Sequence, residues 1–281
     1  MRTLTYKKLI SDFNKKEIDY TSPGFYDHDR FLMYELKNPS FLNSYAALVN
    51  TQTYNENYML KAKTEIPIIA SLLNEELIKD GRLGACIDVS MVLSRILEKE
   101  NYWNYLTKGS LTINFPSLSK KMTKYLWSVD FREFQAAHCW VVAPPFTIID
   151  LTVKQQVFYE SEGNFIPNYI CEKSSGSTMI NEIDIISPKA SKHISALGVK
   201  GSKLEYVKKG FTNFVDNFPA KLIEINGTKF KYCSIAISAS DMALENIRTL
   251  KLKDKLGLEI YQDLIIPKLK EVRLLTLQNL L

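Results

Sequence analysis

The sequence contains few histidines, and its cysteines stand far apart. Among 281 residues there are three histidines and four cysteines, at positions 86, 139, 171 and 233, without any CxxC pair. This spacing predicts neither a disulfide framework nor a zinc site. We expect free thiols in a reducing, cytoplasmic compartment.

Long apolar runs are also missing. The N-terminal stretch MRTLTYKKLISDFNKKEIDY has scattered charges and lacks the apolar segment of a secretory signal. No run approaches the roughly eighteen apolar residues that are needed to cross a bilayer. We therefore expect no membrane association.

A strong excess of charge of one sign is likewise lacking. The chain has 36 basic and 31 acidic residues, for a formal charge of +5. This excess is too mild to indicate nucleic-acid binding, and no RRM, KH or zinc-finger pattern accompanies it. Nucleic acid is therefore not an expected partner. With 46% hydrophobic residues, the chain has the composition of an ordinary globular protein that buries a sizeable core.

Helices are predicted over most of the first hundred residues. Apolar residues recur at helical spacing in residues 64–80 and again in residues 86–100, and two glycines in DGRLGA separate the two stretches. Asp88, in the first turn of the second helix, suits the positive end of the helix dipole.

Strands are predicted after about Trp103, where the apolar period changes to two. They cover residues 105–115, 138–142 and 146–152, and a hairpin turns at Asn226-Gly227. The lysine-rich residues 189–210 are predicted as a surface loop or linker, and the tail from Asp241 as helical with a break near Pro267. This pattern indicates an α+β fold. We expect a main domain with a helical N-terminal part at residues 1–185, and a hairpin and helical extension at residues 186–281 packed on it.

Cys86 is the first candidate for chemistry, because it opens the second predicted helix. Free N–H groups and the partial positive charge at a helix N-terminus favour thiolate over thiol. The same N–H groups can hold the oxyanion that forms when sulfur attacks a carbonyl. The alternative is that Cys86 is a small buried apolar residue, as most free cysteines are.

His138 and Asp150 are the second candidate, in HCWVVAPPFTIID. A turn centred on Pro144 would place them directly opposite one another, close enough for the carboxylate to accept an imidazole N–H. A shift of half a residue would instead place Asp150 opposite Cys139. In the first register Asp150 orients the ring and leaves its other nitrogen free for a thiol. A structural His–Asp pair is the alternative.

GACIDVSMVLSRIL, followed by AHCWVV and IIDLT, resembles the transglutaminase-like branch of the papain-fold cysteine enzymes. Trp140, two positions after the histidine, and the Asp150-Leu151-Thr152 strand end fit the same family. The resemblance covers about residues 80–156. It implies a helix carrying Cys86 packed on an antiparallel sheet. It also implies a triad in which Cys86 is the nucleophile, His138 the general base and acid, and Asp150 the orienting residue.

The sequence also departs from its apparent relatives. The glutamine that precedes the cysteine in papain-type peptidases is absent from KDGRLGA, and the Arg-Gly-Gly-x-Cys motif of arylamine N-acetyltransferases is missing. The Cys86 N–H is therefore the default oxyanion donor. Gln155 and Gln156 either border the cleft or, as we prefer, begin a helix. We interpret His28 and His193 as surface residues, Cys139 as a packing residue, and Asp130, Arg132 and Glu133 as a solvated charged loop.

These residues predict a cysteine enzyme that attacks an amide of a protein or peptide through a thioester, with no metal or organic cofactor. Water as acceptor gives a peptidase or glutamine deamidase, and an amine gives a transglutaminase. The sequence leaves these three open, as it does the oligomeric state. The alternative class is a non-catalytic module with a papain-like shape that binds protein or nucleic acid.

Overall fold

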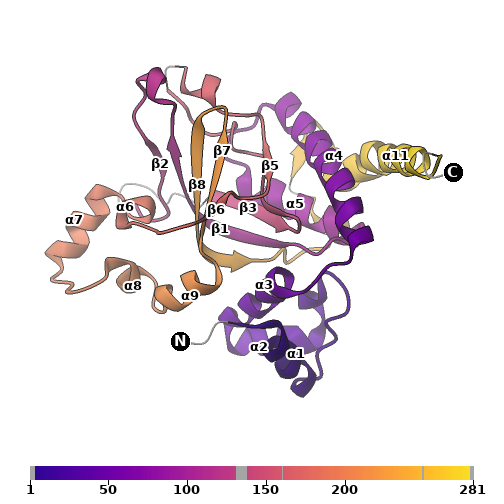
Figure 1. The fold of residues 1–281 in the computed structure, drawn as a ribbon, viewed down its shortest axis with the longest axis horizontal. Coiled ribbons are helices and arrows are strands. Elements are labelled where there is room, and N and C mark those ends of the chain that lie inside the picture. The colour runs from indigo at the N-terminus through magenta and orange to yellow at the C-terminus, as the bar shows by residue number, and fades with distance from the viewer. Residues whose placement is uncertain (1–3, 131–137, 160, 249, 279–281) are drawn as a thin grey trace.

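The structure, a computed structural model, describes residues 4–130, 138–159, 161–248 and 250–278. These residues form an α+β fold in which helices surround one large antiparallel sheet (Figure 1). The α+β class predicted from the sequence is therefore confirmed. Arg132 and Glu133 lie outside the described residues.

Three helices at the N-terminal end gather beside one end of the sheet (Figure 1). They are α1 (Tyr6–Lys15), α2 (Asp29–Lys37) and α3 (Leu42–Thr51). Aromatic rings hold this group together: Phe25 packs edge-on against Phe13, Phe31 and Tyr45, with ring centroids 4.9–5.6 Å apart. Edge-to-face contacts of this kind stabilise a core beyond the area that they bury.

The two long helices carry the predicted apolar stripes. Helix α4 (Glu56–Asp80) begins eight residues earlier than predicted, because the side chain of Asn55 accepts a hydrogen bond from the N–H of Tyr58 and caps it. It ends at Gly81, whose φ of 73° suits a glycine after a helix. Helix α5 (Cys86–Lys99) begins at Cys86, as predicted.

The sheet has eight strands in the order β5-β4-β3-β1-β8-β7-β6, and β2 pairs with β1 beyond the end of β3. Their bounds are β1 Tyr105–Asn114, β2 Lys124–Leu126, β3 His138–Ala143, β4 Phe146–Asp150, β5 Ile170–Glu172, β6 Gly176–Thr178, β7 Ala220–Ile225 and β8 Thr228–Ser238. The predicted hairpin at Asn226-Gly227 is confirmed as β7–β8. Its strand β8 pairs with β1, so residues on both sides of position 185 build one sheet.

The sheet curls until its two edge strands come close together. Strands β5 and β6 lie at opposite ends of the strand order, yet only residues 173–175 connect them. Within this connection the N–H of Ser174 donates to Thr147 of β4, and the N–H of Ser175 donates to the carbonyl of Leu222 on β7. The curled sheet therefore has an inner and an outer face.

Strand β3 is buried on both faces. Trp140 and Val142 pack inside the curl, whereas Cys139, Val141 and Ala143 pack against α4 and α5 on the outer face. Cys139 thus points away from His138, as its place in the alternation predicts. A strand covered on both faces reads as a continuous apolar run, which explains HCWVVA.

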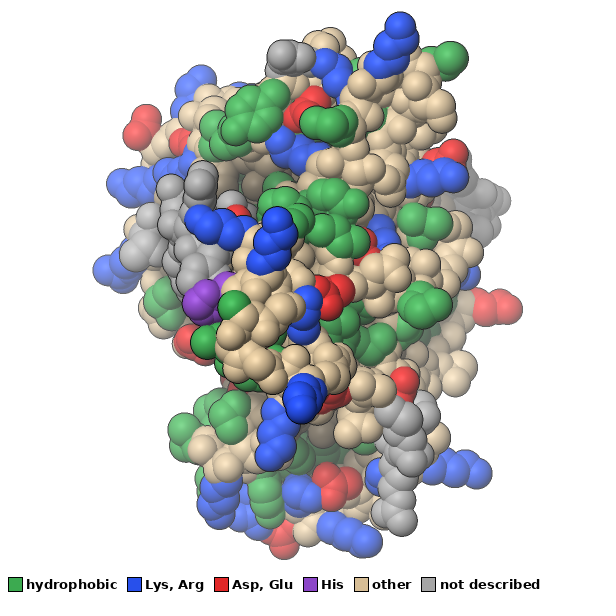
Figure 2. Space-filling model, turned by 90° about the vertical axis from the view of Figure 1, so that its left-hand side faces the viewer, with side chains coloured by type: hydrophobic (Ala, Val, Ile, Leu, Met, Phe, Trp, Pro, Cys, Tyr) green, Lys and Arg blue, Asp and Glu red, His purple; other side chains and the backbone are tan. Residues whose placement is uncertain are grey.

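Residues 188–207 correct the prediction of a loop. They contain α7 (Pro188–Ala196) and α8 (Lys203–Val207), which follow α6 (Glu182–Ile185) and precede α9 (Phe211–Asn217). Ser187 caps α7 ahead of Pro188, and Ala190 and Ile194 form a buried face four residues apart. The many lysines hide this pattern. On the face that these helices occupy, Lys and Arg are interspersed with apolar and acidic side chains (Figure 2).

The tail also differs in part from the prediction of a helix from Asp241. A two-stranded ribbon, β9 (Lys251–Leu252) and β10 (Lys255–Leu256), precedes α10 (Gly257–Ile260). A π-helical turn at Tyr261–Ile265 then leads into α11 (Ile266–Gln278), so a new helix does start beside Pro267. Within the described ranges, none of the helices combines the length and the apolar character that crossing a membrane requires.

Gly109 of β1 lies opposite His138 and has no room for a side chain. A Cβ at this position would lie 2.1 Å from the carbonyl oxygen of Cys233 and 2.7 Å from the ring of Trp140. We expect Gly109→Ala to lower the free energy of unfolding by about 1–3 kcal/mol, because strands β8 and β3 must move apart. Urea denaturation measures this change.

The matched control is Gly176→Ala, in edge strand β6, where nothing lies within 4 Å of the added Cβ. That variant is expected to stay within about 0.5 kcal/mol of the wild type. Equal losses in the two variants would contradict the steric explanation.

Candidate active site

Cys86 is the first residue of α5. The loop before it is fixed by a hydrogen bond to the segment after β4. Gly84, with a φ of 72°, donates its N–H to the carbonyl of Gln155, 3.1 Å away, which ties the loop to the segment after β4. The residue before the helix, Ala85, provides no side-chain cap. The first-turn N–H groups are therefore not taken by a capping side chain, and Cys86 is 6% exposed at a cleft.

His138 opens β3 and is hydrogen-bonded to Asp150 at the end of β4. The Nε2 of His138 lies 2.6 Å from the Oδ2 of Asp150, and the two residues are 3% and 0% exposed. The interpretation of the two as a hydrogen-bonded pair is therefore confirmed. Because Nε2 faces the carboxylate, Nδ1 is the ring nitrogen that remains for a second partner.

The register that suggested this pair is wrong. Val141 lies opposite Ile149 and Ala143 opposite Phe146, so Asp150 lies opposite Trp140 rather than His138 or Cys139. The pairing is irregular beside the turn, where only Pro144 and Pro145 remain between the strands. His138 and Asp150 meet diagonally, at a separation that a ring and a carboxylate can bridge.

Four donors surround the carboxylate of Asp150. Besides the His138 ring, the hydroxyl of Tyr232 donates to Oδ2 over 2.8 Å, and Thr152 donates its N–H and its hydroxyl to Oδ1 over 2.9 and 3.1 Å. A carboxylate has about four acceptor sites, so this one is fully used although it is buried. Its position and charge are thereby held fixed.

These contacts move the pKa values of both partners. Burial alone would lower the pKa of His138, but the charge and hydrogen bond of Asp150, with a contribution from the Cys86 side chain, raise it to about 10. Burial would raise the pKa of Asp150, but His138, Thr152 and Tyr232 hold it below its ordinary value. A charged pair of imidazolium and carboxylate results at neutral pH.

Cys86 and His138 line the same cleft of about 420 Å³, and the Cys86 side chain is close enough to contribute to the raised pKa of the ring. The structure thus brings all three candidate residues together from α5, β3 and β4. All four cysteines are free thiols, and burial raises the pKa of Cys139 and of Cys233 to about 12 and also raises that of Cys171.

One wall of the cleft is the edge of β2. Residues Lys124, Tyr125, Leu126 and Trp127 all line it, although side chains of successive strand residues point to opposite faces. Because these four residues are consecutive, the main chain of β2 and of Trp127 after it borders the cleft. The rings of Tyr125 and Trp127 are stacked, with centroids 5.4 Å apart, and the Trp127 indole donates to the carbonyl of Ile183.

The opposite wall comes from the segment after β4. Gln156, Val157 and Tyr159 line the cleft, with Val157 60% and Tyr159 68% exposed. The preferred prediction that a helix starts at the two glutamines is wrong, because residues 151–156 form a series of bends and residues 157–159 are irregular. Lys124 lies against the rings of Phe158 and Tyr159 and is ion-paired with Glu162, so its charge is balanced.

Sequence reasoning missed Tyr232 and strand β2. Tyr232 lies 82 residues from Asp150 in the sequence. The sequence shows only that Tyr232 shares one face of a predicted strand with Phe230, not that this face meets Asp150. Strand β2 has three residues, too few to show a period.

His28 and His193 are exposed, and Asp130 accepts a hydrogen bond from the Ser187 hydroxyl. In the described part of the chain, His, Cys, Asp and Glu side chains do not gather in groups of three or more that could hold a metal ion. Comparison with protein-family models, with curated proteins and with solved structures gives no match.

Proposed function

We propose that this protein is a cysteine-dependent acyl-transfer enzyme that acts on amide bonds, with Cys86 as nucleophile, His138 as general acid and base, and Asp150 as the residue that orients the ring. We also propose that its core is a papain-like or transglutaminase-like one. The observation that carries the proposal is the 2.6 Å hydrogen bond between His138 and Asp150 beside a cysteine at a helix N-terminus. A His–Asp pair with a purely structural role would not require a cysteine in the cleft that the histidine borders.

In the first half-reaction the His138 ring is protonated and holds the proton of the Cys86 thiol, and the sulfur attacks the carbonyl carbon of the substrate as the thiolate. The new C–S bond places negative charge on the carbonyl oxygen, which the N–H groups at the start of α5 can stabilise. The intermediate then collapses to a thioester. His138 gives its proton to the nitrogen as the C–N bond breaks, and the amine leaves.

In the second half-reaction an acceptor replaces the amine. His138 takes a proton from water or from a second amine, which attacks the thioester carbon. The C–S bond breaks, and the sulfur leaves as the thiolate beside the protonated ring, which restores the starting state. Water yields a carboxylic acid and an amine yields a new amide, so the same three residues serve hydrolysis, deamidation and transamidation.

The walls of the cleft favour a protein or peptide substrate. Strand β2 pairs only with β1 among the described strands, so its other edge has main-chain groups available beside Cys86. An extended peptide can hydrogen-bond to such an edge. The stacked rings of Tyr125 and Trp127, and Val157 across the cleft, offer apolar contacts to its side chains.

A mass measurement tests the nucleophile. On incubation with 4-nitrophenyl acetate, the wild type should gain one acetyl group as a thioester, removable by hydroxylamine, and Cys86→Ala should gain none. The reason is that Cys86 lines a cleft together with His138, whereas burial raises the pKa values of the other three thiols. Intact-mass spectrometry reads the adduct.

Cys171→Ala is the control, because Cys171 is the most exposed of the other three cysteines. That variant should be acetylated like the wild type. Equal acetylation of wild type and Cys86→Ala would contradict the proposal. So would a Cys86 thiol that labels with iodoacetamide no faster than Cys171 across a pH series, which would favour a non-catalytic binding module.

The acceptor is identified with casein as substrate. New N-termini indicate a peptidase, released ammonia a deamidase, and incorporation of dansylcadaverine a transglutaminase. Each signal should be absent from Cys86→Ala.

A further inference from the structure

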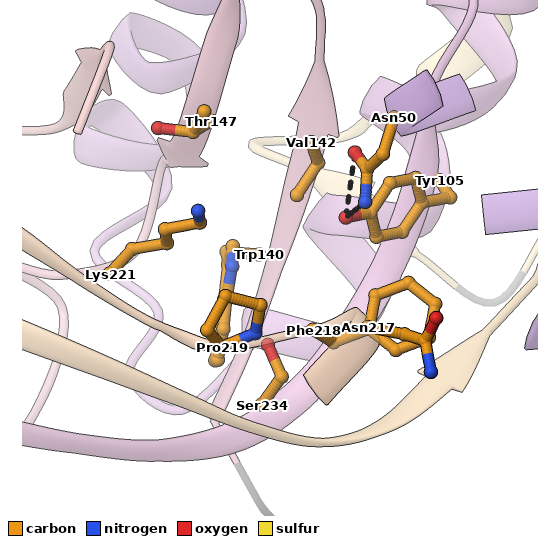
Figure 3. A pocket seen from close by; sticks show the side chains of 10 residues that line it. All are labelled: Asn50, Tyr105, Trp140, Val142, Thr147, Asn217, Phe218, Pro219, Lys221 and Ser234. Carbon is orange, nitrogen blue, oxygen red and sulfur yellow. Dashed lines mark hydrogen bonds between the residues drawn. The ribbon is translucent and has the colours of Figure 1, made fainter. Parts of the chain in front are cut away.

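A second cavity, of about 350 Å³, opens inside the curl of the sheet (Figure 3). Five neighbouring strands each contribute one or two residues to its wall: Thr147 from β4, Trp140 and Val142 from β3, Tyr105 from β1, Ser234 from β8 and Lys221 from β7. Asn50 of α3, Asn217 at the end of α9, and Phe218 and Pro219 after it complete the wall. Its volume lies at the small end of the range for ligand pockets.

This cavity lies on the side of Trp140 away from Cys86. Along β3 the inward-facing residues are His138, Trp140 and Val142. Only His138 borders the Cys86 cleft, whereas Trp140 and Val142 border the second cavity. The Trp140 ring packs between the two, with its centroid 6.2 Å from that of His138 and 5.0 Å from that of Tyr232. The second cavity is thus separate from the proposed active site.

The charge of the cavity comes from one lysine. Lys221 is the only charged residue among the described residues that line it, and no described carboxylate lies within ion-pair distance of its amine. Burial lowers the pKa of this ammonium group. Its Nζ donates to the hydroxyl of Ser177 over 3.2 Å, which leaves two of its three N–H groups for another acceptor.

The side chain of Lys221 extends toward the space between Thr147 and Trp140 (Figure 3). Most of the other polar side chains of the wall already have hydrogen-bond partners. Asn50 and Tyr105 are hydrogen-bonded to each other, and the side chain of Asn217 accepts from the N–H of Leu4. The remaining wall is aromatic, formed by Trp140, Tyr105 and Phe218. The cavity therefore combines one cation at its edge with flat apolar surfaces.

A neighbouring hollow extends the positive character. It shares Asn217 and Phe218 with the cavity and is lined by Lys208 and Lys209. No Asp or Glu borders either space within the described residues. A ligand with a positive charge would find no partner here, whereas an anion would.

We propose that this cavity is a binding site for a small organic acid with one carboxylate and a flat apolar body, in which Lys221 binds the carboxylate and Trp140 contacts the body. The carboxylate would gain charge-assisted hydrogen bonds from an ammonium group that has no carboxylate partner in the described structure. The body would cover the aromatic wall, where apolar contact favours binding. The inference does not depend on the proposed enzymatic function.

The test uses the full chain labelled with ¹⁵N, and benzoate as the probe. The chain has three tryptophans, Trp103, Trp127 and Trp140, so three indole N–H peaks report three places at once. Trp103→Phe and Trp127→Phe variants assign the peaks by elimination. Benzoate should shift the Trp140 peak with a dissociation constant in the millimolar range, as expected for so few atoms, and leave the Trp127 peak in the Cys86 cleft in place.

Lys221→Gln should weaken benzoate binding by about tenfold or more, because the charged hydrogen-bond donor is lost. Lys229→Gln is the matched control, since Lys229 lies on the same hairpin with its side chain 54% exposed, and it should bind as the wild type does. Benzamide, which has the same shape without the charge, should bind about tenfold more weakly to the wild type. Binding that survives Lys221→Gln unchanged, equal binding of benzamide, or an unmoved Trp140 peak would each overturn the proposal.

Discussion

Asp150→Asn is expected to reduce turnover by about four orders of magnitude while the chain still folds. The carboxylate accepts from four donors, and an amide can accept at only one of its two terminal atoms. Whichever way the amide is turned, its NH₂ group faces other donors. The His138 ring then loses both its orientation and the charge that stabilises its protonated form.

The same variant should lower the pKa of His138 from about 10, because the largest remaining influence is burial, which opposes the charged ring. The His138 Cε1–H resonance measures this pKa by NMR. Tyr232→Phe is the control: it removes one hydrogen bond to Oδ2 but keeps the pair, and should cost about tenfold in turnover. Full activity in Asp150→Asn would remove this residue from the mechanism.

The raised pKa of His138 also has a consequence for stability. The ring is protonated in both states below its ordinary pKa of 6.5, so the pair contributes fully there. That contribution is lost as the pH rises toward about 10. Asp150, whose pKa is lowered, contributes above its ordinary value of 3.8 and less as the pH falls below it. The pair therefore stabilises the fold most between about pH 4 and 6.5. On a Cys86→Ala background, Asp150→Asn should reduce the decline above pH 6.5.

The sequence predicted those parts of the site that depend on local pattern. A helical stripe and two glycines placed the start of α5 at Cys86, and β-propensity placed His138 and Asp150 at strand ends. Strand pairing was harder to predict, because it depends on contacts between distant segments. Neither the pairing of β8 with β1 nor the Tyr232 hydrogen bond follows from residues near Asp150. The register of β3 and β4 was missed because packing on both faces of β3 sets it.

Arg95→Met is expected to lower the free energy of unfolding by about 3–5 kcal/mol, the usual loss when one partner of a buried ion pair is removed. Arg95 lies on the outer side of α5 and is 7% exposed. Its guanidinium binds Asp27 and Glu98 over 2.5 and 2.8 Å and donates to the carbonyls of Ser240 and Met242. It thus joins the helix of Cys86 to the N-terminal helices and to the segment after β8. Urea denaturation measures the loss.

Two comparisons show whether the loss of stability in Arg95→Met comes from the unpaired carboxylate of Glu98 or from the lost packing of Arg95. Lys99 lies on the same helix as Arg95, and Lys99→Met, which removes an exposed ion pair with Glu245 of the segment after β8, should cost less than about 1 kcal/mol. The side chain of Glu98 is only 10% exposed, and desolvation already raises its pKa. Without Arg95 its charge is opposed further, so the variant should recover stability as the pH falls toward 4.5, where the carboxyl takes up a proton. Adding Glu98→Gln to Arg95→Met should restore part of the loss at pH 7. If the double variant is no more stable than Arg95→Met, the methylene stem of Arg95 and its backbone hydrogen bonds carry the effect instead.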